Sequence, residues 1–155
     1  MQIVHLINGP NVNLLGHPAM RSYSEVTLAS IEQRCKEVAQ SLDMELVARQ
    51  TNHEGQLVDW LQDSLIKDAA VVINAGALAF SSLLLAETVG LLSRPVVEVH
   101  MSNTHKSEDY KHSLMAPKVS AVICGLGPHV YESGIYAVKA LLKLKSAQSA
   151  GAPAR

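Results

Sequence analysis

The chain has 155 residues, 48% of them hydrophobic and 17% charged, with a formal net charge of -1 at pH 7. This length and apolar content suit one domain with one sizeable core. Lysine and arginine are scattered, so no basic face is predicted and we expect no nucleic-acid partner. No apolar run approaches the roughly 20 residues of a membrane helix, and the N-terminus lacks the pattern of a leader peptide. We therefore expect a soluble cytoplasmic protein with no membrane partner.

The first half of the chain alternates predicted strands with helical patterns. Residues 2–8 form an apolar strand pattern, and a long connection rich in Gly, Pro and Asn follows over residues 9–24. A helical period from Leu28 to Leu42 precedes a second strand at residues 44–50. Thr51 and Glu54 match a capping box that would begin the next helix, which carries an apolar period from Leu57 to Leu65.

The second half continues in the same way. Strands are predicted at residues 70–74, 95–100 and 119–125, and helical patterns at residues 83–92 and 135–144, with the leucines at 83–85 expected in the core. Cys35 and Cys124 lie far apart without metal-ligand spacing, so both are expected to be buried free thiols. Residues 1–145 are therefore predicted to form a single domain, and residues 146–155 an unstructured tail.

The alternation of strands and helices predicts an α/β fold. Five nearly unbroken apolar strands favour a parallel sheet with helices on both faces, a three-layer sandwich, and the strand number favours the flavodoxin-like order. Ligands bind such sheets beyond the carboxyl ends of the strands. Four of the five predicted strand ends are polar or rich in glycine, so their loops are expected to line one crevice, with residues 9–24 as a mobile cover.

Several motifs then support a family resemblance. The segments "INGPNVNLLG" closing on Tyr23, "QTNHEGQLVDW", "INAG", "VEVHMSN" and "GLGPHVYESGIYAV" together resemble the type II 3-dehydroquinate dehydratases over about 140 residues. The resemblance implies a flavodoxin-like fold and a homo-oligomer, a dodecamer built as a tetramer of trimers. It also implies a hydro-lyase of the shikimate pathway, which removes water from 3-dehydroquinate by anti elimination through an enolate, without metal or organic cofactor.

The resemblance assigns roles to individual residues. Tyr23 matches the base that removes a C2 proton, and a phenol needs nearby positive charge to do so at neutral pH because its ordinary pKa is about 10. Asn74 matches the residue holding the water that stabilises the enolate. Glu98 matches an acidic residue that orients imidazoles of the site. The implied substrate contacts are Asn11 on the lid, His100, Ser102, the backbone amide of Met101, and Glu87, which matches an aspartate reaching into a neighbouring subunit's pocket.

Three positions depart from the family pattern. The histidine that protonates the departing hydroxyl in the family is replaced by Phe80, and losing a general acid typically costs about 10²–10⁴-fold in rate. The lid arginine that favours the tyrosinate is replaced by Pro18. Lys111 replaces another arginine, so the charge is retained but the planar fork is lost. Phe80 would also make the floor of the substrate pocket apolar.

Two residues of the lid are candidates for the missing roles. Arg21 lies two positions before Tyr23 and would bring a guanidinium to the phenol or to the substrate. His17 lies next to Pro18 and would act as a proton donor on lid closure, since imidazoles titrate in the useful range. A solvated loop histidine is the competing interpretation.

Two classes of function remain open from the sequence. One is a dehydratase of this family with slow or altered turnover. The other is a non-catalytic or altered-substrate relative that binds a cyclic hydroxy-acid. A flavodoxin is disfavoured because "NGPNVNLL" lacks a phosphate loop rich in Ser, Thr and Gly. A response-regulator receiver is disfavoured because the strand ends lack an acidic cluster.

Overall fold

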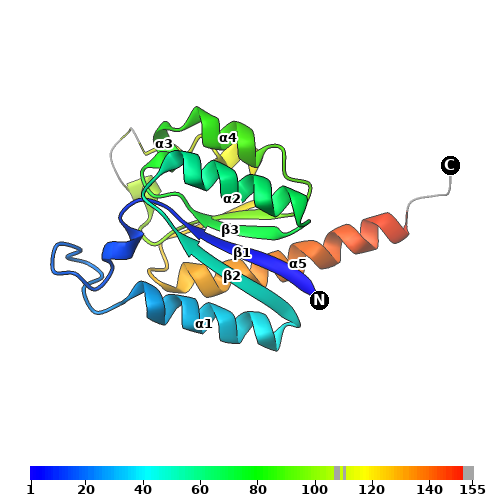
Figure 1. The fold of residues 1–155 in the computed structure, drawn as a ribbon, viewed down its shortest axis with the longest axis horizontal. Coiled ribbons are helices and arrows are strands. Elements are labelled where there is room, and N and C mark those ends of the chain that lie inside the picture. Colours follow the sequence, from blue (N-terminus) through cyan, green and yellow to red (C-terminus); the bar gives the residue numbers. More distant parts are fainter. Residues whose placement is uncertain (107–108, 110, 152–155) are drawn as a thin grey trace.

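A parallel five-stranded sheet organises the chain (Figure 1). The computed structural model describes residues 1–106, 109 and 111–151. The strands are β1 (Gln2–Asn8), β2 (Met44–Gln50), β3 (Ala70–Asn74), β4 (Val96–His100) and β5 (Ala121–Cys124). They pair in the order β2-β1-β3-β4-β5, all parallel, which confirms the flavodoxin-like order predicted from the sequence.

Helices cover both faces of the sheet, as Figure 1 shows. One face carries α1 (Leu28–Ser41) and α5 (His129–Ala150), and the other carries α2 (Glu54–Ile66), α3 (Leu78–Ser81) and α4 (Leu83–Val89). Side chains alternate between the faces along each strand, so that Val72 joins the core under α1 and α5 while Val71 and Ile73 join the opposite one. This arrangement confirms the predicted three-layer α/β sandwich.

The start of α2 differs from the prediction. Its N-cap is His53, without a side-chain cap, and Thr51 Oγ1 accepts a hydrogen bond from the His53 backbone N–H at 3.1 Å. The Glu54 carboxylate instead accepts a hydrogen bond from the hydroxyl of Ser82, the N-cap of α4. The predicted Thr51–Glu54 capping box is therefore wrong, because a tertiary contact takes the carboxylate that the local motif would have used.

A capping box does occur at α1. Thr27 Oγ1 accepts from the Ser30 backbone N–H at 3.1 Å, and Ser30 Oγ accepts from the Thr27 backbone N–H at 3.3 Å. Here a serine occupies the position that glutamate or glutamine usually takes, so the motif does not stand out in the sequence.

Two apolar predictions also fail. Leu85 is fully buried, but Leu83 and Leu84 are 65% and 51% exposed, because α4 presents only one side to the sheet. Cys35 is buried, and burial raises the pKa of its thiol to about 12. Cys124 is only half-buried, since β5 is an edge strand.

The C-terminal helix is longer than the apolar pattern indicated. Helix α5 continues to Ala150, so the prediction of an unstructured segment from residue 146 is wrong for residues 146–150. These residues are exposed on a helix that runs past the sheet (Figure 1). Alanine, glutamine and serine need no buried face to continue a helix already begun, which explains why apolar periodicity missed them. Residues 152–155 lie outside the described residues.

His5 in β1 is fully buried and makes a polar contact in the core. Its Nδ1 lies 2.7 Å from Ser64 Oγ, whose own hydroxyl donates to the Trp60 carbonyl, so we assign the proton to Nδ1. Burial lowers the pKa of His5, and neighbouring Arg49 acts in the same direction. A neutral His5 therefore joins β1 to α2.

The described residues include no helix that is both long and apolar enough to cross a membrane. The cytoplasmic location expected from the sequence stays a prediction.

Candidate active site

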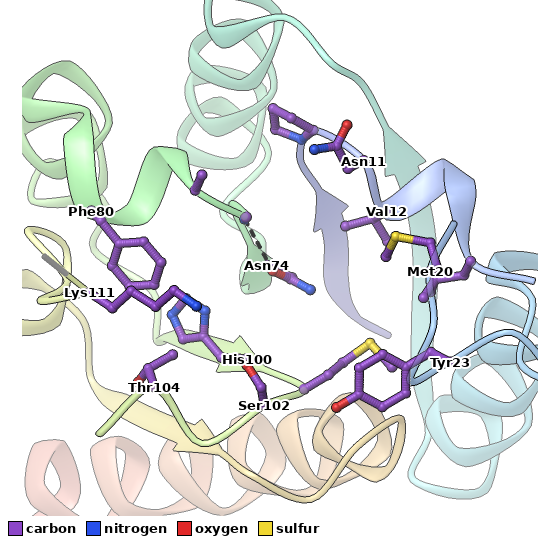
Figure 2. Close-up of a pocket in the computed structure, with 15 residues that line it drawn as sticks. Asn11, Val12, Met20, Tyr23, Asn74, Phe80, His100, Ser102, Thr104 and Lys111 are labelled. Atoms are coloured by element: carbon purple, nitrogen blue, oxygen red, sulfur yellow. Dashed lines mark hydrogen bonds between the residues drawn. The ribbon is translucent and has the colours of Figure 1, made fainter. Parts of the chain in front are cut away.

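A cavity of about 250 Å³ lies at the carboxyl edge of the sheet, where the strand-end loops were expected to converge (Figure 2). Asn74 from the end of β3 lies between two walls. Phe80, His100 and Lys111 form one wall, and the lid residues Val12, Met20 and Tyr23 form the other. The walls thus combine segments that are far apart in the sequence.

Two glycines allow the loops after β1 and β3 to pack against each other. A Cβ added at Gly9 would lie 2.7 Å from the Ala75 carbonyl oxygen, so any larger residue would push the loops apart. Gly76 has φ +59, and a Cβ there would meet the Pro10 carbonyl oxygen at 3.0 Å. The glycines of "NGPN" and "NAGA" therefore keep Asn74 close to the lid.

Asn74 is fixed by a buried hydrogen-bond network. Its Nδ2 donates to the Tyr131 hydroxyl oxygen at 2.7 Å, and its Oδ1 accepts from the Gly76 backbone N–H at 3.1 Å. The Tyr131 hydroxyl donates in turn to Asn8 Oδ1 at 2.8 Å. Tyr131 is fully buried, and burial raises the pKa of its phenol above the ordinary value, so it acts as a neutral donor.

His100 is held by a buried carboxylate and an aromatic ring. Its Nε2 lies 2.6 Å from Glu98 Oε1, and Glu98 is fully buried in β4. The Phe80 ring stacks on the imidazole with centroids 5.4 Å apart and an interplanar angle of 20°. The ring that occupies the family's acid position therefore packs directly against the one imidazole that the described lining contains.

The lid covers the cavity with apolar and polar groups. Within the lid, Val12 and Leu15 are buried. The Gly16 N–H donates to the Tyr23 carbonyl at 3.2 Å, which closes the loop between these two residues. Tyr23 and Asn11 line the cavity, as their predicted roles require. Mobility of the lid stays a prediction.

The two lid candidates for the missing roles lie elsewhere. Arg21 and His17 are exposed, and neither is among the described residues that line the cavity. His17 Nδ1 accepts a hydrogen bond from the Ala19 backbone N–H at 3.1 Å. Their predicted roles would require the lid to move, and both stay predictions.

The other predicted contacts divide into two groups. Met101, Ser102 and Lys111 line the cavity together with His100, from β4 and the loops beyond it. Glu87 is exposed on α4 and lines a different surface hollow with Leu84 and Leu91. Glu87 therefore does not line the cavity of its own chain. Among the described residues, no three His, Cys, Asp or Glu side chains come together as a metal site would require.

Some site residues escaped the sequence-based reasoning. Tyr131 and Asn8 lie beneath the cavity, while Met20 and Thr104 contribute to its walls. Tyr131 falls in the segment "GLGPHVYESGIYAV", which carried the resemblance but offered no local sign that its hydroxyl would reach β1 and β3.

Comparison with known proteins shows which family the chain is related to. The model of the class II dehydroquinases matches residues 1–139. The chain belongs to the class II dehydroquinase family. A 3-dehydroquinate dehydratase from Rhizobium johnstonii is 42% identical over 139 residues, covering 89% of this chain and 96% of that protein. One from Azorhizobium caulinodans is 44% identical over 136 residues, covering 87% and 92%.

Solved structures of the family share the fold. The type II dehydroquinase from Propionibacterium acnes superposes with a TM-score of 0.85 at 28% identity, covering 90% of this chain and 97% of that one. A 3-dehydroquinate dehydratase-like protein from Bifidobacterium longum has a TM-score of 0.71 at 26% identity, covering 92% and 99%. The resemblance found in the sequence motifs is thereby confirmed over most of the chain.

The Tyr131 bridge yields a stability prediction. Tyr131→Phe keeps the ring but leaves Asn8 Oδ1 and Asn74 Nδ2 without their partner, so we expect the free energy of unfolding to fall by about 1–3 kcal/mol. Urea denaturation measures this. Tyr136→Phe, on the same helix but 51% exposed, is the matched control and should change it by less than about 0.5 kcal/mol. Equal effects of the two variants would show that the bridge contributes nothing.

Proposed function

We propose that this chain is a 3-dehydroquinate dehydratase that eliminates water through an enolate, with turnover slowed or altered by Phe80 and Pro18. Membership of the family supports this reaction. The observation that carries the proposal is that one cavity is lined by both Tyr23 and Asn74. The cavity of about 250 Å³ suits a small cyclic acid.

The proposed roles follow from the positions of the side chains. Tyr23 on the lid removes the C2 proton, and Asn74, immobilised by Tyr131, orients the water that stabilises the enolate. Lys111 supplies positive charge to the wall that receives the carboxylate, with Ser102 and the Met101 amide beside it. Asn11 and His100 complete the contacts to the ring hydroxyls, and Glu98 orients the His100 imidazole.

Phe80 favours a second candidate function. Its phenyl ring covers one face of the His100 imidazole, so the cavity wall that contains Phe80, His100 and Lys111 is partly apolar. Such a wall suits a ligand without the departing hydroxyl, and the alternative is therefore an altered-substrate or non-catalytic relative that binds a cyclic hydroxy-acid. Binding without turnover of 3-dehydroquinate would favour this alternative.

We also propose the dodecamer that the resemblance implies. Leu84 and Leu91, 51% and 65% exposed, flank Glu87 in one hollow on α4. Clustered exposed leucines are typical of subunit interfaces, and Glu87 there would reach a neighbouring pocket.

Turnover should respond to residue 80. The unaltered protein is expected to dehydrate 3-dehydroquinate slowly, and Phe80→His should raise kcat by up to about 10²-fold because it restores a proton donor where the family has one. Pro18→Arg added to it should raise the rate further by favouring the Tyr23 phenolate. Absorbance of the conjugated enone product measures the rate.

The control is Phe80→Leu, which removes the ring without adding a donor and should gain nothing. An unaltered protein as fast as ordinary family members, or an equal gain from leucine and histidine, would contradict the role assigned to Phe80.

The assembly is tested by sedimentation. We expect a particle of about twelve chains, and Leu84→Asp should break it into smaller species by burying a charge at the interface. Ile66→Asp, on α2 and 82% exposed, is the control and should leave the mass unchanged. A monomeric unaltered protein would refute the dodecamer.

A further inference from the structure

Three neighbouring strands of the sheet end in side-chain amides. Asn8 of β1 lies in register with Gln50 of β2 on one side and with Asn74 of β3 on the other. A buried hydroxyl of α5 joins Asn8 to Asn74. Gln50 instead reaches the segment that follows β1, because its Nε2 lies 3.2 Å from the Gly9 carbonyl oxygen and 3.3 Å from Asn13 Oδ1. The outer amide of this row therefore faces the start of the lid.

Asn52 connects Gln50 to the backbone of Asn11. Its Oδ1 accepts a hydrogen bond from the Asn11 backbone N–H at 3.0 Å and lies 3.2 Å from Gln50 Nε2. A backbone N–H can only donate, so Asn52 must present its oxygen to Asn11, and Gln50 then meets that oxygen with its NH₂ group. The Thr51 N–H donates to the Asn8 carbonyl at 3.0 Å, which keeps the end of β2 beside β1. We call Gln50 and Asn52 the amide clamp.

Asn11 has a backbone conformation that needs such support. Its φ is 70°, in the left-handed region that few residues other than glycine adopt, although asparagine tolerates it better than most. It precedes a short 3-10 helix at Val12–Leu14, and its own side chain makes no capping hydrogen bond there. Asn11 is also exposed, so packing alone holds it weakly. The contact from Asn52 therefore fixes the backbone and leaves the Asn11 side chain available to a ligand.

The amide clamp reaches the cavity through Asn11. Neither Gln50 nor Asn52 is among the described residues that line the cavity, whereas Asn11 lines it on the lid side (Figure 2). Asn52 is exposed and belongs to neither apolar core, so the fold does not depend on the packing of its side chain. The position of Asn11 is therefore what this contact controls.

We propose that Gln50 and Asn52 are positioning residues, which hold the Asn11 backbone so that the Asn11 amide meets a ring hydroxyl of the ligand. The inference rests on the proposed function, in which Asn11 contacts 3-dehydroquinate. A mobile Asn11 would have to be ordered whenever the substrate binds, which lowers affinity. The amide clamp removes this cost because Asn11 is already ordered in the free protein. Its effect falls on KM rather than on kcat, since the contact is made equally in the ground state and the transition state.

Hydrogen exchange tests whether the amide clamp holds Asn11 without any ligand. Asn52→Ala removes the acceptor, so hydrogen–deuterium exchange of the Asn11 amide should become about tenfold faster in the free protein. Asn52→Asp keeps an acceptor oxygen and should stay within about threefold of the unaltered rate. Mass spectrometry of the peptide that contains Asn11 follows the exchange. Gln56→Ala, exposed on α2 and outside the cavity lining, is the control and should change nothing.

The affinity for 3-dehydroquinate tests the consequence for the ligand. Asn52→Ala and Gln50→Leu should each raise KM by about 3–10-fold, the effect of one lost hydrogen bond, while kcat stays within about threefold of the unaltered value. Asn52→Asp should restore KM because the acceptor is kept. Calorimetry with Tyr23→Phe added to each variant gives the same change as a dissociation constant without turnover. Gln56→Ala again serves as the control.

A double-mutant cycle with Asn11→Ala separates positioning from a merely structural role. Once the Asn11 amide is gone, Asn52→Ala should weaken binding by less than about twofold further, because the amide clamp acts through that amide. The inference is overturned if Asn52→Ala leaves the exchange or the affinity unchanged, or if it weakens binding equally with and without the Asn11 side chain. An unaltered protein that neither binds nor dehydrates 3-dehydroquinate would refute the proposed function and the positioning role with it, even if Asn52→Ala speeds exchange.

Discussion

The buried phenol of Tyr131 connects a helix and two strand ends by hydrogen bonds, and the shape of the cavity depends on these contacts. Tyr131, near the start of α5, donates to Asn8 at the end of β1 and accepts from Asn74 at the end of β3. Both amides would otherwise be buried without these partners, which is costly in an apolar interior. The bridge therefore fixes the helix, two strand ends and the orientation of Asn74 at once. Gly9 and Gly76 complete this arrangement by letting the two loops above the bridge touch.

The wall opposite the lid shows how a lost group changes the chemistry of its neighbours. Glu98 is a fully buried carboxylate with one oxygen bonded to His100 and the other without a partner among the described residues. Phe80 stacks on His100 and offers no hydrogen-bonding group, so its ring restricts the imidazole by packing alone.

The sequence predicted those features that follow from local periodicity and chain order. Apolar β-branched runs such as residues 70–74 are buried on both faces, and such runs identify strands of a parallel sheet without further information. The strand ends in turn indicated where Asn74 and His100 would meet. Resemblance to the family supplied the proposed roles of Tyr23 and Asn74, which periodicity alone does not indicate.

The failures have a common cause, which is tertiary competition for local groups. Glu54 matched a capping motif, but Ser82 from another helix takes its carboxylate. Leu83 and Leu84 fit an apolar helix, yet only Leu85 faces the sheet. Tyr131 reaches residues 57 and 123 positions away, and no spacing rule reports such a contact. Side-chain partners across the core therefore required the structure.

A crystal structure with bound 3-dehydroquinate, collected on a slow variant such as Tyr23→Phe, tests the central claim most directly. The ring should lie in the cavity above Asn74, with its carboxylate toward Ser102 and Lys111 and with residue 23 facing C2. A cavity that stays empty at saturating ligand, or a ring whose C2 faces away from residue 23, would contradict it.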